Sequence, residues 1–431
     1  MAESDKKIKV LVLGDHPLSF SGVGTQLRYI CEALVRSGKF QVVNLGGAIK
    51  HENYSPVKFE EFEQDWRIFP VDGYGNDEII RSTIRTERPD IMLIMTDPRF
   101  WGWLWKIEQE IRSLLPIVYY HVWDNFPAPT FNRPYYLSND LIVTISKVTD
   151  KIVKEVSPEV SSVYLPHAVD LGVFKKKNAD EVKKFRKESF ETSGIEDDGK
   201  MLFFWNNRNA KRKQSGTLIW WFKEFLEKVG DDKAMLVMHT DPYDENGQDL
   251  QAIIEHLKMD NGQVLFSKEK MPPEYLSLIY NMADCTINIS DAEGFGLGTL
   301  ESLACETPVI VSMTGGLQEQ VVDDDKNWFG YGIPPVSKAI IGSQDVPWIY
   351  EDRISKEDFL DSMIKFYNLK KKDREEIGAA GRAHVEKNYG FAEYKHKWVE
   401  LLLKTHKDFG SWETRKDYKP WHQTDFSGDK K

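Results

Sequence analysis

The sequence predicts an α/β protein whose parallel sheets carry helices on both faces and which divides into two domains. Short apolar runs alternate with amphipathic helical segments along the chain, which is the pattern of parallel sheets covered by helices. The chain has 431 residues. Because a domain usually has about 100–200 residues, two domains with separate cores are expected. Hydrophobic content of 41% and charged content of 29% are typical of a globular protein.

The first half opens with a strand, a loop and a helix. The apolar run Ile8–Leu13 is stopped by Gly14 and predicts a strand. A helix is predicted from about Thr25, because apolar residues recur at helical spacing until Gly38, a typical helix end. Further strands of this half are predicted at Phe40–Leu45, Ile91–Met95, Ile117–Tyr120, Leu141–Ile145 and Val163–Leu165.

The second half repeats the alternation after a lysine-rich polar stretch, residues 175–200, in which one surface helix is expected. Strands are predicted at Met201–Trp205, Ala234–His239, Val264–Phe266 and Cys285–Ile289, and helices at Thr217–Val229, Leu250–Leu257 and Pro273–Met282. Aromatic and aliphatic residues then recur at helical spacing from Phe391 to Leu402, which predicts one more amphipathic helix.

Composition excludes several classes of protein. The polar start, residues 1–7, and the short strand after it do not resemble a signal sequence, and no run approaches the roughly 20 apolar residues of a membrane span. Three widely spaced cysteines favour a reducing cytoplasm over a disulfide framework or a metal site. The 57 basic and 68 acidic residues give a net charge of −11, which repels nucleic acid and anionic lipid.

A glycine-rich turn after the strand Cys285–Ile289 carries the strongest chemical signal. Glycines let the backbone approach a ligand, and the unpaired N–H groups of the helix that follows favour an anion such as phosphate. Glu293 and Glu301 flank the turn and are better suited to accept hydrogen bonds from neutral hydroxyls, as in a ribose and a hexose. A nucleotide-sugar offers both, whereas a lone glycine turn would be only a helix start. The turn comprises Glu293, Gly294, Phe295, Gly296 and Leu297.

At this point the chain resembles the retaining glycosyltransferases of family four, which have the glycosyltransferase-B fold of two Rossmann-like domains facing across a cleft. The resemblance implies that Glu293 binds hydroxyls of the donor sugar and that Glu301 binds the ribose. The amides of Gly294, Phe295, Gly296 and Leu297 would then contact the sugar and the diphosphate. The matching residues are Ser290, the glycine turn, Leu300-Glu301, Thr307-Pro308-Val309-Ile310 and Gly315-Gly316.

The resemblance also implies a domain organisation. Residues 1–170 would form the acceptor-side domain, and residues 171–389 would bind the donor nucleotide. Residues 390–431 would form a helix that crosses back to the first domain, with a tail that is either disordered or clamped onto it. Between Ile333 and Arg353 the chain is longer than the corresponding loop of the family, and the sequence assigns no purpose to this insertion.

Two basic residues match the family's diphosphate-binding pair. Arg208 and Lys213 follow the strand Met201–Trp205 with the family's spacing. A forked guanidinium and a compact ammonium suit a leaving group that gains negative charge. The family's neighbouring glycines are Asn207 and Gln214 here, which weakens the match, and an isolated basic loop would simply be solvated.

In the first domain the resemblance points to a glycine pair and a histidine. Gly22 and Gly24 open the first helix, where the family has a loop that approaches the donor phosphates and the acceptor. His121 ends the strand Ile117–Tyr120 and matches the histidine that the family places near the reacting carbon. A lone histidine is otherwise usually structural.

Together these features predict a retaining, metal-independent transferase that uses a nucleoside-diphosphate sugar, with uridine as the expected base, and needs no cofactor or metal. The acceptor is a glycan, a lipid, a small molecule or a modified base in DNA. DNA would require a local basic face from Lys147, Lys151, Lys154 and the run Lys175–Lys177. The Asn-rich basic loop and the insertion look similar to virus-encoded members, which would act in the host cytoplasm. The alternatives are an epimerase or phosphorylase of the same fold, or a non-catalytic sugar-nucleotide binding protein.

Overall fold

The computed structural model describes residues 6–19, 21–195, 199–416 and 418–421. The chain divides into two compact units. Unit 1 consists of Met1–His167, Gly342–Trp348 and Ala392–Lys431, and unit 2 consists of Ala168–Ile341 and Ile349–Phe391. The divisions expected after residues 170 and 389 lie beside those of the structure. The membership of residues 342–348 in unit 1 was not predicted.

Unit 1 is built on an eight-stranded sheet with the order β3-β4-β2-β1-β5-β6-β7-β8. Within the described residues all neighbouring strands are parallel except β3, which pairs antiparallel with β4. All five residues of β5 are buried, as expected for a strand covered on both faces. The strands are β1 (Ile8–Asp15), β2 (Phe40–Gly47), β3 (Val57–Lys58), β4 (Trp66–Pro70), β5 (Ile91–Met95), β6 (Ile117–His121), β7 (Leu141–Thr144) and β8 (Ser162–Tyr164).

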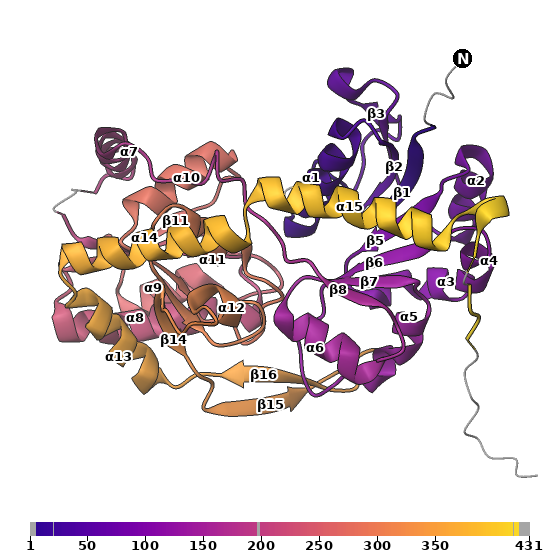
Figure 1. Cartoon of the computed structure of the whole chain (residues 1–431). Helices are drawn as coiled ribbons and strands as arrows, with labels where there is room; N and C mark the ends of the chain where they lie inside the picture. Colours follow the sequence, from indigo (N-terminus) through magenta and orange to yellow (C-terminus); the bar gives the residue numbers. More distant parts are fainter. Residues whose placement is uncertain (1–5, 20, 196–198, 417, 422–431) are drawn as a thin grey trace, which may run out of the picture. The chain divides into compact units, whose positions relative to one another are not determined.

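The helices of unit 1 pack around this sheet (Figure 1). The first helix begins at Gly22, earlier than expected, because the Ser21 hydroxyl accepts a hydrogen bond from the Gly24 amide and caps it. The α-helices are α1 (Gly22–Arg36), α2 (Asp77–Glu87), α3 (Gly102–Trp105), α4 (Glu108–Arg112), α5 (Arg133–Leu137), α6 (Lys147–Val156) and α15 (Phe391–Phe409), whose first residue lies in unit 2.

Unit 2 has a six-stranded parallel sheet with the order β11-β10-β9-β12-β13-β14 and a separate antiparallel hairpin, β15–β16. The strands are β9 (Met201–Asn206), β10 (Ala234–His239), β11 (Val264–Ser267), β12 (Cys285–Asn288), β13 (Val309–Ser312), β14 (Gly330–Ile333), β15 (Ser337–Ile341) and β16 (Ile349–Arg353). The helices are α7 (Ala179–Thr192), α8 (Ser215–Val229), α9 (Leu250–Leu257), α10 (Pro273–Met282), α11 (Leu297–Ala304), α12 (Leu317–Val321), α13 (Lys356–Tyr367) and α14 (Lys371–Asn388).

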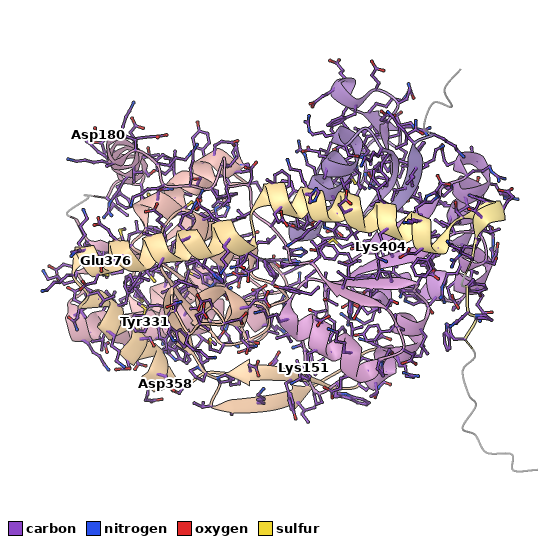
Figure 2. All side chains as sticks on the ribbon, in the orientation of Figure 1. Lys151, Asp180, Tyr331, Asp358, Glu376 and Lys404 are labelled. Carbon is purple, nitrogen blue, oxygen red and sulfur yellow. The ribbon has the colours of Figure 1, made fainter. Side chains whose placement is uncertain are left out.

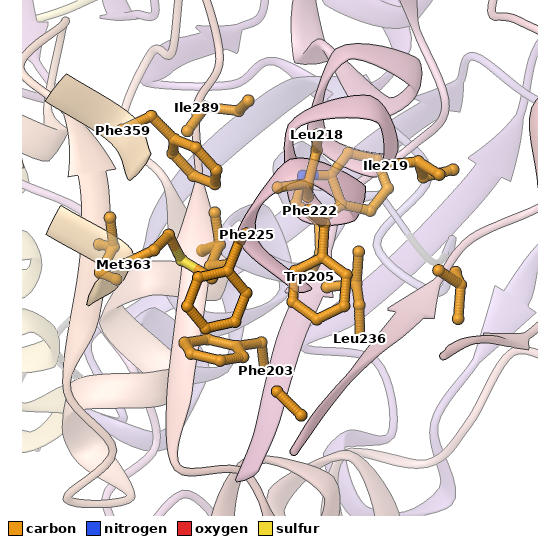
Figure 3. Close-up of a cluster of buried hydrophobic side chains, with 14 of the residues drawn as sticks. Phe203, Trp205, Leu218, Ile219, Phe222, Phe225, Leu236, Ile289, Phe359 and Met363 are labelled. Carbon is orange, nitrogen blue, oxygen red and sulfur yellow. The ribbon is translucent and has the colours of Figure 1, made fainter. Parts of the chain in front are cut away.

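An aromatic core holds the helices of unit 2 on its sheet (Figure 3). Phe203 of β9 contacts Phe222 and Phe225 of α8, with ring centroids 5.9 and 5.6 Å apart, and Phe366 of α13 at 6.1 Å. All four side chains are fully buried. Because each large ring removes about 150–250 Å² from water, this cluster fixes the position of β9, which leads to the predicted site residues Arg208 and Lys213.

Both sheets have a point at which the strand order reverses. In unit 1 it is β1, which lies between β2 and β5, and in unit 2 it is β9, which lies between β10 and β12. Open α/β sheets bind ligands beside the carboxyl ends of the strands at such switch points. The fold therefore directs attention to residues after β1 and β5 in unit 1, and after β9 and β12 in unit 2.

The C-terminal segment of unit 1 is held by a buried charge network. Arg415 donates to Asp140 at 2.7 Å, and the side chains are 3% and 2% exposed. Arg112 donates to the same carboxylate at 3.1 Å and to Glu108 at 3.1 Å. Of the two alternatives for the tail, residues 410–416 therefore clamp onto the first unit, whereas residues 422–431 lie outside the described part of the chain.

Arg415→Met should lower the free energy of unfolding by about 2–4 kcal/mol, because it removes one partner of a buried carboxylate while Arg112 remains. Urea unfolding followed by tryptophan fluorescence measures the loss. Glu413→Gln is the matched control, since Glu413 is 84% exposed in its pair with Arg88 and should leave stability nearly unchanged. Equal, small effects of both changes would mean that the segment is not held in this way.

Candidate active site

The glycine-rich turn lies where the sequence placed it, between β12 and α11 at the switch point of unit 2. Gly296 caps α11 with a φ of +91°, and a Cβ there would lie 2.4 Å from Leu317 Cδ2. Gly315 has a φ of +47°, and its Cβ would lie 1.7 Å from the Glu293 carbonyl oxygen. Both positions therefore require glycine, and Gly315 lets the following loop close tightly on the backbone of Glu293.

Glu293 and Lys213 form a largely buried ion pair, with side chains 12% and 8% exposed. Asn288 Nδ2 also donates to Glu293 Oε2 at 3.3 Å, and Ser290 Oγ does so at 3.5 Å. Burial on its own would raise the pKa of Glu293, but Lys213, Arg212 and these hydrogen bonds outweigh it and lower the pKa. The structure thus keeps a charged carboxylate and an ammonium group side by side at the end of β12.

Glu301 lies in a different environment, one turn into α11. Its Oε2 accepts a hydrogen bond from the Tyr280 hydroxyl at 2.9 Å, and that hydroxyl accepts one from Asn206 Nδ2 at 2.7 Å. Burial raises the pKa of Glu301 to about 7, although the Tyr280 bond lowers it in part. Glu301 can therefore exchange a proton near neutral pH, unlike Glu293.

Arg208 follows β9 and is 64% exposed, so it is more accessible than Lys213. Its guanidinium donates to both carboxylate oxygens of Asp244, with distances of 2.5 and 3.1 Å. The hydrogen bond from Arg208 lowers the pKa of Asp244 to about 2. Sequence reasoning placed the arginine here but did not find its carboxylate partner.

The other predicted residues belong to unit 1, where they lie at the carboxyl ends of its own strands. Gly24 is required by close packing, since a Cβ would lie 2.2 Å from Ser19 Oγ and 2.7 Å from the His16 carbonyl oxygen. Gly22 is the first residue of α1. His121 ends β6 and is fully buried, with Nε2 2.8 Å from the Tyr136 hydroxyl. Burial lowers its pKa to about 3, so the imidazole is neutral.

Several residues that shape the site had no signal in the sequence. Tyr280 and Asn206 fix Glu301, Asp244 holds Arg208, and Asp291 joins the loops that carry Lys213 and Glu293. Each acts through a partner at least 21 positions away, so neither spacing nor local composition could reveal the pairing. Phe295 belongs to the predicted turn, but its ring is buried against Tyr389 and is therefore part of the core.

The described residues contain no helix long and apolar enough to cross a membrane. In the same part of the chain, no group of three or more His, Cys, Asp or Glu side chains is arranged to hold a metal ion.

Comparison with solved structures supports the fold. Sucrose-phosphate synthase from Thermosynechococcus elongatus superposes with a TM-score of 0.73 at 15% identity, over 94% of this chain and 100% of that one. HepE from Anabaena, solved with UDP and glucose, gives 0.66 at 12% identity, over 92% and 99%. These likenesses confirm the predicted fold class, an α/β protein with Rossmann-like parallel sheets and the glycosyltransferase-B fold.

Sequence comparison supports a family for the second half of the chain. A segment of 69 residues is 42% identical to the D-inositol 3-phosphate glycosyltransferase of Acidothermus cellulolyticus, and it spans 16% of this chain and 15% of that protein. A 52-residue segment is 42% identical to the enzyme of the same name from Segniliparus rotundus, over 12% of each chain. The model of the family described as glycosyl transferases group 1 matches residues 185–384. This part of the chain is therefore similar to a glycosyl transferases group 1 domain.

Proposed function

We propose that the protein is a retaining glycosyltransferase that moves a hexose-type sugar from a nucleoside-diphosphate sugar, with uridine as the expected base, to a hydroxyl acceptor. The observation that carries the proposal is the buried pair of Lys213 and Glu293 beside the glycine turn, at the switch point of a group 1 domain. A diphosphate would complement the ammonium group and the N–H groups at the start of α11, and a sugar hydroxyl would complement the carboxylate.

The same residues suggest how the reaction proceeds. The bond from the anomeric carbon to the diphosphate oxygen breaks as the acceptor oxygen bonds to that carbon on the same face. The departing phosphate oxygen takes the acceptor proton, so no protein base is required. Lys213 and Arg208 would stabilise the negative charge that grows on this oxygen, in place of a metal ion. Glu293 would hold the sugar by its hydroxyls.

Roles for the remaining predicted residues follow from their surroundings. Glu301, fixed by Tyr280, would accept hydrogen bonds from the ribose, and Gly294, Gly296 and Leu297 would present their amides to the phosphates. In unit 1, Gly22 and Gly24 would let backbone approach the ligand. His121 would act as a neutral imidazole, because burial lowers its pKa to about 3. Its Nδ1 has no hydrogen-bond partner among the described residues.

The surface of unit 1 favours an uncharged acceptor over DNA. At the switch point, Asp15 ends β1, and the nearby Arg99 is already paired with Asp97 through bonds of 2.8 and 2.6 Å. On α6, Lys154 is paired with Asp150. The ammonium group of Lys151, a residue labelled in Figure 2, lies 5.2 Å from the Phe126 ring centroid. Binding to duplex DNA that weakens steeply with salt would contradict this preference.

A panel of UDP, GDP, ADP and their glucose conjugates, read by thermal shift, tests the function. One nucleotide should stabilise the protein by about 2.7 kcal/mol at a hundred times its dissociation constant. Its sugar conjugate should then be consumed with retention of the anomeric configuration when an acceptor is supplied, and EDTA should not stop the reaction. Conversion of the sugar without an acceptor would instead indicate an epimerase. Stabilisation by none of the nucleotides would contradict the proposal.

The Glu301→Gln variant should be more stable than the wild-type protein but should bind the donor nucleotide more weakly, and both differences should depend on pH. The pKa of Glu301 is about 7 in the folded protein and 4.5 in the unfolded chain. The stability contributed by the protonated side chain is therefore lost as the pH rises from about 4.5 to about 7. The glutamine variant should therefore be about 1–3 kcal/mol more stable than wild type at pH 8 and nearly unchanged at pH 5. Urea unfolding at the two pH values measures this difference.

The same Glu301→Gln change that raises stability should weaken nucleotide binding. At pH 8 the wild-type carboxylate can accept two hydroxyl groups, so Glu301→Gln should weaken nucleotide affinity by about 1.5–3 kcal/mol. The deficit should shrink at pH 6, where Glu301 is protonated in the wild-type protein. Titration of the nucleotide is common to both proteins and cancels in the comparison. A deficit of equal size at both pH values would remove Glu301 from the ribose site.

A further inference from the structure

The hairpin β15–β16 lies in the insertion to which the sequence assigned no purpose (Figure 1). Its second strand contacts the loops that follow β12 and β13. The Asp352 amide donates to the Asp291 carbonyl at 2.9 Å, and the Asp352 carboxylate accepts from Thr314 Oγ1 at 2.7 Å. Arg353 Nη1 lies 3.1 Å from Asp291 Oδ2. The end of β16 is therefore bonded to the segment that leads to Glu293.

Asp291 is the point at which these contacts converge. Its side chain is 5% exposed and also accepts a hydrogen bond from Gln214 Nε2, while its amide donates to the Arg212 carbonyl at 2.8 Å. Arg212 Nη1 in turn donates to the Ala292 carbonyl at 2.5 Å. These bonds join residues 211–214, which carry Lys213, to residues 291–293, which carry Glu293.

The charge of Asp291 depends on the hairpin. Burial raises its pKa to about 6, while Gln214 and Arg353 oppose that rise and Glu351 and Asp352 add to it. A buried carboxylate is costly unless it is paired, and Arg353 is the cation bonded to it. Gln214 is fixed at its other end as well, because its amide oxygen accepts from Thr217 Oγ1 at 2.6 Å.

We propose that Arg353 is a positioning residue of the donor site: through Asp291 it holds the Lys213 loop against the Glu293 turn in the geometry that a sugar diphosphate requires. The inference rests on the proposed function for the identity of the ligand, but the contacts themselves do not. The family's glycine after the lysine is replaced by Gln214 here, and the insertion supplies the cation that completes the bridge through Asp291.

Arg353→Met tests this link through Asp291, because it keeps an unbranched apolar stem and removes the guanidinium and its charge. In the unliganded protein, hydrogen exchange should become faster in peptides that contain residues 211–215 and 290–294. Affinity for the nucleoside diphosphate that stabilises the wild-type protein should fall three- to tenfold by calorimetry. Arg353→Lys should restore part of both. Lys338→Met is the matched control, since Lys338 pairs with Asp352 at 3.3 Å on the same hairpin without contacting Asp291, and should change neither.

The outcomes test the link from Arg353 through Asp291 separately from the proposed function. Faster exchange with weaker binding, in Arg353→Met alone, supports the inference. Unchanged exchange overturns it, and if binding is then weaker, Arg353 contacts the ligand itself. Faster exchange with unchanged affinity overturns the role in the donor site. If the wild-type protein binds none of the diphosphates, the proposed function fails, while the exchange data still decide whether Arg353 holds the two loops together.

Discussion

The ion pair between Lys213 and Glu293 is the interaction on which the site of unit 2 depends. Lys213 and Glu293 are carried by separate loops after β9 and β12, and both are largely buried. An unpaired charge at this depth would cost several kcal/mol, so each residue makes the burial of the other acceptable. The aromatic core around Phe203 places β9, and the close contact of Gly315 with the Glu293 backbone places the turn. The charges are thus arranged before any ligand arrives.

This arrangement gives the two glutamates different chemical characters. Glu293 is held ionised by its ammonium neighbour, whereas Glu301, which accepts a hydrogen bond from a tyrosine hydroxyl, exchanges its proton near neutral pH. Arg208 remains at the surface on Asp244. In the proposed reaction the buried ammonium would meet the charge that develops at the breaking bond. The exposed guanidinium would move from Asp244 to the diphosphate, at the cost of a surface ion pair worth about 1 kcal/mol or less.

Much of this could be predicted from the sequence, and the limits have physical causes. Continuous apolar runs revealed the buried strands, and every predicted helix and strand is present. Helix α14 was missed because Gly378 and Gly381 interrupt its pattern. Those glycines allow close packing, since a Cβ on Gly378 would lie 2.0 Å from the Glu306 carbonyl oxygen. Motif spacing singled out Glu293, Lys213 and their neighbours as candidate site residues, but the partners of these residues come from distant segments and have no local signature.

The central claim is that Glu293 holds the sugar of a sugar diphosphate while Lys213 and α11 hold its phosphates. The most direct measurement is calorimetric affinity for UDP and for UDP-glucose in the wild-type protein and in Glu293→Gln. We predict that the wild-type protein binds the sugar conjugate more tightly than UDP, and that the variant loses this increment while retaining its affinity for UDP. An increment of the same size in both proteins would contradict the account.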